Sequence, residues 1–166
     1  MDLTAERLRE VLSYSPETGE FRWRIRASKK THVGAVAGCC RPDGYTSIRI
    51  DKGLYLAHRL VWLYMTGKWP AEQLDHRNHV RSDNRFRNLR ECSQLENAAN
   101  MSLHKDSVVP YKGVSFDPRR GTYSARICKD SIRAHIGTFS TAIEAAAAYD
   151  AVSEKYHGKF SNPNGV

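Results

Sequence analysis

LDHRNHVRSDNRFRNLRECSQLENAAN, residues 74–100, is the stretch from which we infer the fold of this chain. It places an acid and a histidine side by side, Asp75 and His76, ahead of a loop rich in arginine and asparagine. Ser93 followed by Glu96 has the spacing of a capping box, so we expect a helix that begins at Ser93. The stretch therefore predicts an acid–histidine pair, a basic loop and a capped helix in close succession.

The side chains of this stretch suit phosphodiester hydrolysis. A neutral imidazole such as that of His76 can accept a proton from water near pH 7. Asp75 and Asn97, which falls on the second turn of the expected helix, offer the hard oxygen ligands that suit Mg²⁺. Such an ion stabilises the charge that develops on a phosphate and on the departing oxygen. The spacing alone leaves an ordinary loop as the alternative, because Asp and Asn also favour turns through local hydrogen bonds.

Basic residues of the same stretch would hold a polyanion over this centre. Between residues 77 and 90 there are five arginines and one acid, Asp83. We expect all five arginines to contact DNA: Arg77, Arg81, Arg85, Arg87 and Arg90.

The whole phrase resembles the HNH motif of phage and intron-encoded homing endonucleases. The motif positions are Asp75-His76, Asn88 and Asn97, and the resemblance extends from about Tyr55 to Asn100. The surrounding segments that carry it are Ala57–Trp62, Gly67–Pro70, Asp83–Arg85, Asn88–Arg90 and Glu96–Asn97.

The resemblance implies a ββα-metal fold, in which a strand ends at His76, a second short strand lies near Leu89, and a helix carries Asn97. It also implies roles for the motif residues. His76 would be the general base on water, and Asp75 and Asn97 would bind Mg²⁺, with Mn²⁺ as the other candidate ion. Asn88 would hold the His76 loop in place.

Composition agrees with a soluble protein that binds nucleic acid. The chain has 166 residues, of which 40% are apolar and 27% charged, so we expect small cores. Its formal charge of +8 favours a polyanionic partner. The four cysteines form no C-x-x-C pair, so we expect them to be reduced thiols. Reduced thiols are typical of a cytoplasmic protein, and if the protein is phage-encoded that would be the cytoplasm of the host cell. We expect no membrane partner, because no apolar run approaches ~18 residues.

Residues 1–54 predict a small antiparallel sheet with a helix beside it, in a region that contacts DNA. The helix is expected from Thr4 to Leu12. Strands are expected at Phe21–Ile25, Gly34–Gly38, Tyr45–Ile50 and Leu54–Leu56. The basic residues that would follow phosphates are Arg22, Arg24, Arg26, Lys29, Lys30 and Arg49, although alternating arginine is also typical of a solvated strand face.

Residues 55–100 form the expected nuclease domain, which also contains a helix from Ala57 to Met65. His58, at the start of that helix, is expected to be structural, because a lone histidine in that position is more often structural than catalytic. His79, on the loop, is given no chemistry. Trp62 and Trp69 are expected to pack on the core.

Residues 101–110 predict a linker, and residues 111–163 a three-stranded antiparallel sheet packed on one helix. The strands are expected at Lys112–Phe116, Thr122–Cys128 and Ile132–Ile136. Thr141 and Glu144 form a second capping box, and Gly158 ends the helix. Its buried stripe is expected to be Ala145, Tyr149, Val152 and Tyr156.

This C-terminal segment resembles the AP2 DNA-binding domain through Lys112-Gly-Val, Tyr123–Ile127, Ile136–Phe139, Glu144-Ala-Ala and Ala148-Tyr-Asp150. That family lays a three-stranded sheet in the major groove. Carried over by position, the DNA contacts would be Lys112, Ser115, Arg119, Arg126, Arg133 and His135, with Arg120 on the same turn as Arg119. The sequence departs from the plant-type pattern at four positions, Ser115, Asp117, Cys128 and His135. The plant target site is therefore not implied.

Together these features predict an α+β protein that acts as a metal-dependent HNH homing-type endonuclease on double-stranded DNA. Because each chain has one active centre, the default expectation is a monomer that nicks one strand. A dimer would cut both strands. The alternative is a sequence-specific DNA-binding regulator whose nuclease part is an inactive scaffold. An RNA-binding protein is a third candidate, but the sequence has no recognisable RNA motif.

Overall fold

A computed structural model of the chain describes residues 3–29, 31–94, 96–97, 107–129 and 132–166. The chain divides into two compact units, Met1–Cys92 and Ser93–Val166. The predicted fold class, α+β with small antiparallel sheets, is confirmed. None of the helices that the structure describes has the length and apolar character that a membrane span requires.

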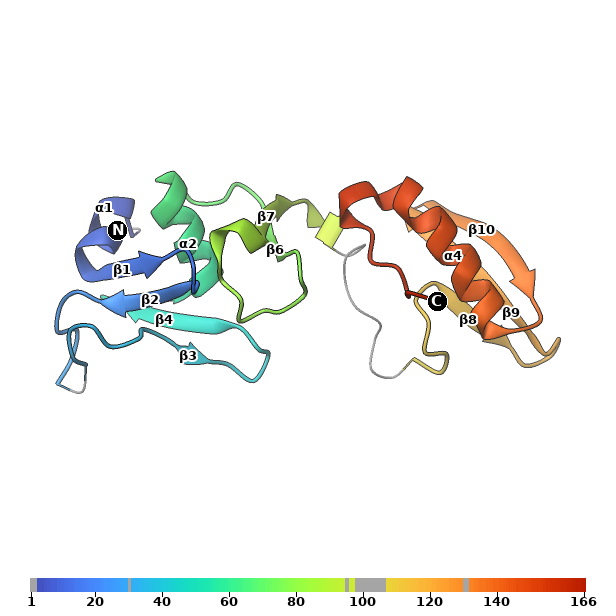
Figure 1. Cartoon of the computed structure of the whole chain (residues 1–166), viewed down its shortest axis with the longest axis horizontal. Coiled ribbons are helices and arrows are strands. Elements are labelled where there is room, and N and C mark those ends of the chain that lie inside the picture. The colour runs from blue at the N-terminus through green and yellow to red at the C-terminus, as the bar shows by residue number, and fades with distance from the viewer. Residues whose placement is uncertain (1–2, 30, 95, 98–106, 130–131) are drawn as a thin grey trace. The chain divides into compact units, whose positions relative to one another are not determined.

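The first unit contains two helices and three small antiparallel sheets among its described residues (Figure 1). The helices are α1 (Ala5–Val11) and α2 (Ala57–Thr66), with a 3₁₀ turn, η1 (Phe86–Asn88). The strands are β1 (Leu12–Ser15), β2 (Glu20–Trp23), β3 (Cys39–Cys40), β4 (Thr46–Ile50), β5 (Gly53–Leu56), β6 (Gln73–His76) and β7 (Leu89–Cys92). They pair as β1–β2, β3–β4–β5 and β6–β7.

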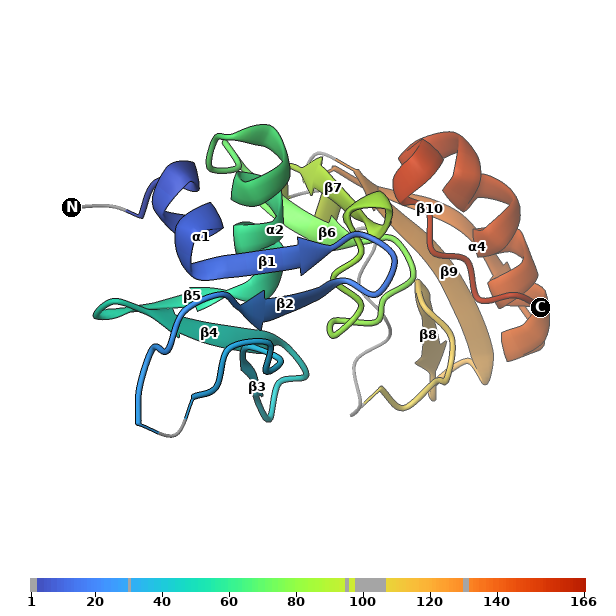
Figure 2. The same cartoon turned by 60° about the vertical axis from the view of Figure 1, so that its left-hand side comes forward.

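One apolar core joins the N-terminal elements to those around the site. It extends from Leu3 on the α1 side to Leu89 on β7, with Leu60 and Val61 of α2 fully buried in it. Trp62 and Trp69 are partly buried against this core, as predicted. Figure 2 shows the turn of the β1–β2 hairpin reaching the loop that follows β6. The N-terminal hairpin therefore supports the part of the chain that carries the candidate site.

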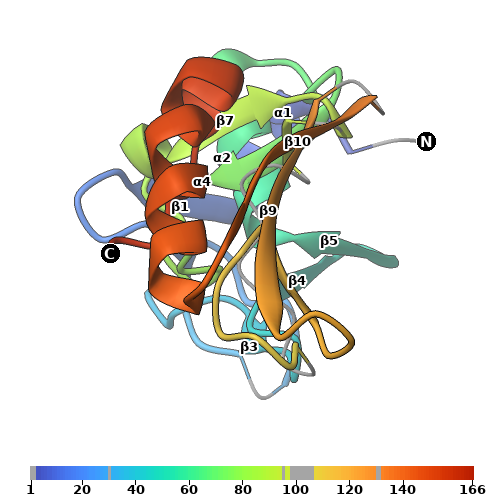
Figure 3. The same cartoon turned by 90° about the vertical axis from the view of Figure 1, so that its right-hand side faces the viewer.

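The second unit is a three-stranded antiparallel sheet with one helix on it, in the order expected from the sequence. Figure 3 shows α4 lying along one face of that sheet. Its elements are β8 (Val114–Asp117), β9 (Thr122–Lys129), β10 (Ile132–Phe139), α4 (Ala142–His157) and η2 (Gly158–Phe160). Both helix boundaries are confirmed, because Thr141 and Glu144 form a capping box and Gly158 adopts a φ of 52°.

Several local predictions differ from the structure. Leu12, which was expected to end the first helix, instead begins the strand Leu12–Ser15, and within Gly34–Gly38 the structure has only an isolated bridge, Val36 to Arg22. Tyr156, which was expected in the buried stripe of α4, is exposed. Ser153, one turn earlier in the same helix, is buried. Small side chains allow close approach to the sheet, and the Ser153 hydroxyl is satisfied by that of Ser161 at 2.5 Å.

Parts of the predicted linker and helix lie outside the described residues. Of residues 101–110 the structure describes 107–110, and there Val109 is buried in the second core. The predicted helix start at Ser93 is confirmed for the described residues. Glu96 N donates to Ser93 Oγ at 3.2 Å, and Ser93 N donates to Glu96 Oε2 at 2.8 Å. Lys30 and Asn100 lie outside the described residues.

Candidate functional site

Asp75 lies on β6 and is paired across the hairpin with Arg90 on β7. The two residues are direct partners in the antiparallel register. Arg90 Nε and Nη2 both donate to Asp75 Oδ2, at 2.8 and 2.6 Å. The two residues are 7% and 8% exposed, so this is a buried ion pair. It fixes the carboxylate beside His76, and a buried charge of either sign without the other would be strongly unfavourable.

His76 ends β6, and its imidazole is 4% exposed. Its Nε2 lies 3.3 Å from Asn84 Oδ1. Its Nδ1 makes no hydrogen bond with any residue in the part of the chain that the structure describes. Burial lowers the pKa of His76, and its contacts with Asn84 and Asp75 oppose that shift. The side chain is therefore a neutral imidazole with one nitrogen engaged, which is the form that can accept a proton.

Asn88 ties together the two ends of the loop after β6. Its Nδ2 donates to Asn78 Oδ1 at 2.9 Å and to the Asp83 carbonyl at 2.8 Å. Its Oδ1 accepts from Asn78 N at 3.1 Å, and its own carbonyl accepts from Arg77 N at 2.9 Å. Asn88 thus makes contacts to both halves of the loop that begins at Arg77.

The His76 ring forms a cluster with two other aromatic rings, those of His58 and Tyr45. The His58 and His76 rings are 5.2 Å apart in an edge-on arrangement, and Tyr45 lies 5.2 Å from His58 and 6.0 Å from His76. Burial, with the nearby His76 and Arg59, lowers the pKa of His58 to about 4. His58 Nδ1 is buried without a hydrogen-bond partner in the described structure. His58 is therefore a neutral packing partner of His76 at pH 7.

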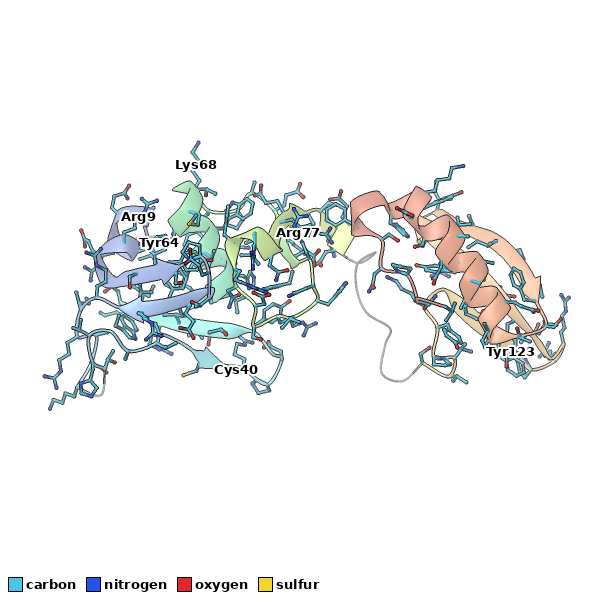
Figure 4. The ribbon with its side chains drawn as sticks, in the orientation of Figure 1. Arg9, Cys40, Tyr64, Lys68, Arg77 and Tyr123 are labelled. Carbon is cyan, nitrogen blue, oxygen red and sulfur yellow. The ribbon has the colours of Figure 1, made fainter. Side chains whose placement is uncertain are left out.

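The five arginines predicted to face DNA occupy different positions. Arg77, Arg81 and Arg87 are exposed, and Figure 4 labels Arg77 on the loop after β6. Arg81 lies over the Tyr45 ring at 4.9 Å. Arg85 bonds to Asp83, and that contact lowers the pKa of the Asp83 carboxyl to about 2. Arg90 differs from the expectation because it is buried against Asp75.

Asn97 lies in the second unit, whereas Asp75, His76 and Asn88 lie in the first. It is helical, and its backbone N donates to the Ser93 carbonyl at 2.9 Å. Among the described residues, no group of three His, Cys, Asp or Glu side chains could hold a metal ion. A carboxylate and an amide oxygen nevertheless fit Mg²⁺ by donor chemistry, because that ion commonly has only one or two protein ligands and takes the rest from water and phosphate.

The second unit presents most of its predicted DNA contacts on one face of its sheet. Residues directly opposite in an antiparallel pair share a face, and Arg126 pairs with His135, Cys128 with Arg133, and Ser115 with Ser124. The neighbouring residues on β9, Ala125 and Ile127, are buried instead. We call the open side the outer sheet face. Its exposed members among the predicted contacts are Ser115, Arg126, Arg133 and His135, and Arg119 and Arg120 are exposed on the adjoining turn.

Lys112 lies just before the outer sheet face and is half-buried. Its backbone N donates to Asn164 Oδ1 at 2.6 Å, and burial lowers the pKa of its amine. Cys39, Cys40, Cys92 and Cys128 form no disulfide in the described structure, and of these four Cys92 is the buried one. His79 is exposed, with a φ of 61°.

Sequence reasoning assigned no site role to Asn84 and missed Tyr14 and Tyr45, and it placed Arg90 on the surface. Asn84 stands within the segment that resembles the HNH phrase, but nothing in its spacing indicates contact with His76. Arg90 could have been found, because antiparallel strands that end at His76 and begin at Leu89 place Arg90 opposite Asp75.

Residues 55–99 match a family described as HNH endonuclease, and the chain therefore contains an HNH endonuclease domain there. A search of curated proteins finds no match to the chain. The matched residues include Asp75, His76, Asn88 and Asn97, and the domain indicates DNA endonuclease activity.

Proposed function

We propose that this protein is a metal-dependent, homing-type HNH endonuclease that hydrolyses phosphodiester bonds of double-stranded DNA. The observation that carries the proposal is the geometry of His76 within the family-matched region. Its Nε2 is engaged by Asn84, its Nδ1 has no hydrogen bond within the described structure, and a fixed carboxylate stands next to it in the chain. This is an arrangement that a general base on water requires.

In the proposed reaction, His76 Nδ1 accepts a proton from a water molecule. The water oxygen forms a bond to phosphorus in line with the bond from phosphorus to the 3′ oxygen, which breaks. The leaving 3′ oxygen takes a proton from solvent and His76 returns its proton to solvent, so the products are a 3′ hydroxyl and a 5′ phosphate. Asn88 would hold the loop after β6 in shape during this step, through its contacts with Asn78 and Asp83.

Asp75 and Asn97 would hold the divalent cation, with Mg²⁺ as the first candidate and Mn²⁺ as the second. When bound, the ion would supply stabilisation of the charge on the phosphate and on the leaving oxygen. Arg90 fixes the Asp75 side chain through its two bonds to Oδ2, so we assign Arg90 to the site rather than to the DNA-facing set.

We further propose that the second unit binds DNA through its outer sheet face, in the manner of an AP2 domain. Support comes from the exposed arginines Arg126 and Arg133, which lie on the same face as His135. Phosphate contacts from these residues and from Arg77, Arg81 and Arg87 would supply affinity. A monomer with one active centre would nick its target, and a dimer would cut both strands.

Relaxation of supercoiled plasmid carrying the protein's own genomic flank tests the enzymatic part. We expect relaxation with Mg²⁺, none with EDTA, and a loss of about 10²–10⁴-fold in rate for His76→Ala, since the general base is removed. His79→Asn is the matched control, because it changes an exposed histidine of the same loop and asparagine tolerates positive φ. It should retain its cleavage rate.

Two outcomes would count against this function. Equal rates for His76→Ala and His79→Asn would exclude His76 as the base. No cleavage by the wild-type protein, together with salt-sensitive retention of the same DNA in a gel, would favour the DNA-binding regulator.

A further inference from the structure

Asn84 is a buried side chain that contacts His76 and to which the HNH resemblance assigns no role. It is 4% exposed and lies in the loop between β6 and η1. Its Nδ2 donates to the Ser82 carbonyl at 3.2 Å. An amide nitrogen only donates, so this contact determines which way the amide faces, and Oδ1 is the atom toward His76 Nε2.

The orientation of Asn84 determines the tautomer of His76. An amide oxygen only accepts, so His76 Nε2 must carry the hydrogen of the neutral ring. Nδ1 then carries the lone pair, and Nδ1 is the nitrogen without a hydrogen bond in the described structure. When Nδ1 accepts a proton, the Nε2–H bond to Asn84 becomes a charge-assisted hydrogen bond and strengthens.

Asn84 is itself held by the N-terminal hairpin. Tyr14 Oη, on β1, donates to the Asn84 carbonyl at 2.9 Å and accepts from Phe86 N at 2.9 Å. Gly19, in the β1–β2 turn, adopts a φ of 76°, and a Cβ there would lie 2.7 Å from the Asn84 carbonyl carbon and 2.6 Å from Arg85 N. The hairpin thus contacts the backbone of Asn84 and of the two residues that follow it, Arg85 and Phe86.

We propose that Asn84 and Tyr14 are positioning residues for the general base. Asn84 fixes the tautomer and ring orientation of His76, and Tyr14 fixes the backbone of Asn84 from a strand 70 positions away in the sequence. The catalytic part of this proposal rests on the function proposed above, whereas the tautomer does not. The first strand of the chain is then part of the catalytic unit rather than a separate DNA-binding segment.

The tautomer can be measured without cleavage. Long-range ¹H–¹⁵N correlation spectra of the full chain, labelled with ¹⁵N-histidine, distinguish protonated from unprotonated ring nitrogens, and His76→Gln assigns the His76 signals. We expect the Nε2–H form in the wild type at a pH where the ring is neutral. Asn84→Ala, which has no acceptor, should shift the ring toward a tautomer mixture, and Asn84→Asp, which keeps one, should retain Nε2–H.

A wild-type ring in the Nδ1–H form would overturn the proposal even if no variant folds. An unchanged tautomer in a folded Asn84→Ala protein would overturn it as well. These results are independent of nuclease activity, so an inactive protein with the expected tautomer would reject the proposed function and leave the role of Asn84 on the ring intact.

Cleavage kinetics test the role of Tyr14. Tyr14→Phe removes the hydroxyl that holds the loop, and we expect kcat to fall by about 10-fold with KM little changed, since DNA binding is not touched. Tyr55→Phe is the matched control, because it removes a hydroxyl from the same unit that makes no hydrogen bond in the described structure. Equal kcat values for the two variants, or a change confined to KM, would exclude positioning by Tyr14.

Discussion

In the first unit the polar side chains of the candidate site lie inside the protein, whereas in the second unit the candidate DNA contacts lie on an open sheet face. Among the described residues, the first unit buries six polar or charged side chains and the second buries one, Ser153. Those of the first unit are His58, Asp75, His76, Asn84, Asn88 and Arg90. In the first unit, the candidate site residues are therefore also buried parts of the folded structure. In the second unit, the candidate DNA contacts lie outside the buried core.

The difference reflects two physical tasks. A general base must be held in one orientation and one protonation state, and burial with fixed partners achieves both. A DNA-contacting side chain must meet phosphates in solvent, and its guanidinium needs exposure more than a fixed position. Substitutions of the buried polar side chains of the first unit should accordingly change stability and chemistry together, while those on the outer sheet face should change affinity alone.

The largest effect on stability is expected from Arg90. Arg90→Leu removes the guanidinium that forms the buried ion pair with the Asp75 carboxylate, so the free energy of unfolding of the first unit should fall by about 3–5 kcal/mol. Urea unfolding followed by tryptophan fluorescence measures this unit selectively, because the three tryptophans of the chain all lie in it.

Arg87→Leu is the matched control for Arg90, because Arg87 is an exposed arginine close to it in the chain, and it should change stability by no more than about 0.5 kcal/mol. A double variant, Asp75→Leu with Arg90→Leu, should recover most of the loss, since two apolar groups can replace a buried pair. If Arg90→Leu lowers the free energy of unfolding no more than Arg87→Leu does, the buried ion pair does not stabilise the first unit, and the contrast drawn between the two units is wrong.

Local features of the fold were predictable from the sequence because they depend on neighbours in the chain. Both capping boxes, at Ser93 and at Thr141, follow from a spacing of three residues. The short strands ending at His76 and beginning at Leu89 followed from the resemblance, and the structure has them as β6 and β7.

Contacts between distant segments were not predictable in the same way. Nothing in the sequence indicates that Tyr14 bonds to the Asn84 carbonyl, since that contact depends on how the N-terminal hairpin packs on the core. The apolar pattern of α4 also misplaced Tyr156, because packing against the sheet depends on small size as well as on hydrophobicity. The buried side of α4 contains Ser153, which no count of apolar residues selects.

A second, pH-dependent effect separates the units further. His58 is held neutral, with its pKa lowered from 6.5 to about 4. Between these values the unfolded chain binds a proton that the folded protein does not, so stability is full above about pH 6.5 and declines as the pH falls toward 4. The loss from this group is up to about 3 kcal/mol.

His58→Phe tests this prediction, since it keeps a ring beside His76 and removes the titrating nitrogens. We expect the tryptophan-monitored unfolding free energy of the variant to depend less steeply on pH between 6.5 and 4 than that of the wild type. The same slope in both proteins would show that His58 is not held neutral. His135→Phe is the control, because His135 lies in the second unit, which contains no tryptophan, and the measured slope should stay as in the wild type.

The smallest effect on stability, and the clearest on binding, is expected at Arg126. Its side chain is exposed beside His135 on the outer sheet face, so Arg126→Ala should change the free energy of unfolding by no more than about 0.5 kcal/mol.

The binding experiment has two informative results. If Arg126 contacts a phosphate, the DNA affinity of Arg126→Ala falls and the slope of log K against log salt decreases by about 1. If it reads a base edge instead, discrimination against altered target sites weakens by about 1–3 kcal/mol and the salt slope stays the same. Lys155→Ala, which removes an equal charge from an exposed position of α4, controls for net charge and should leave the slope unchanged. Equal DNA binding by both variants would mean that the outer sheet face is a solvated surface, and the two units would then differ in burial but not in task.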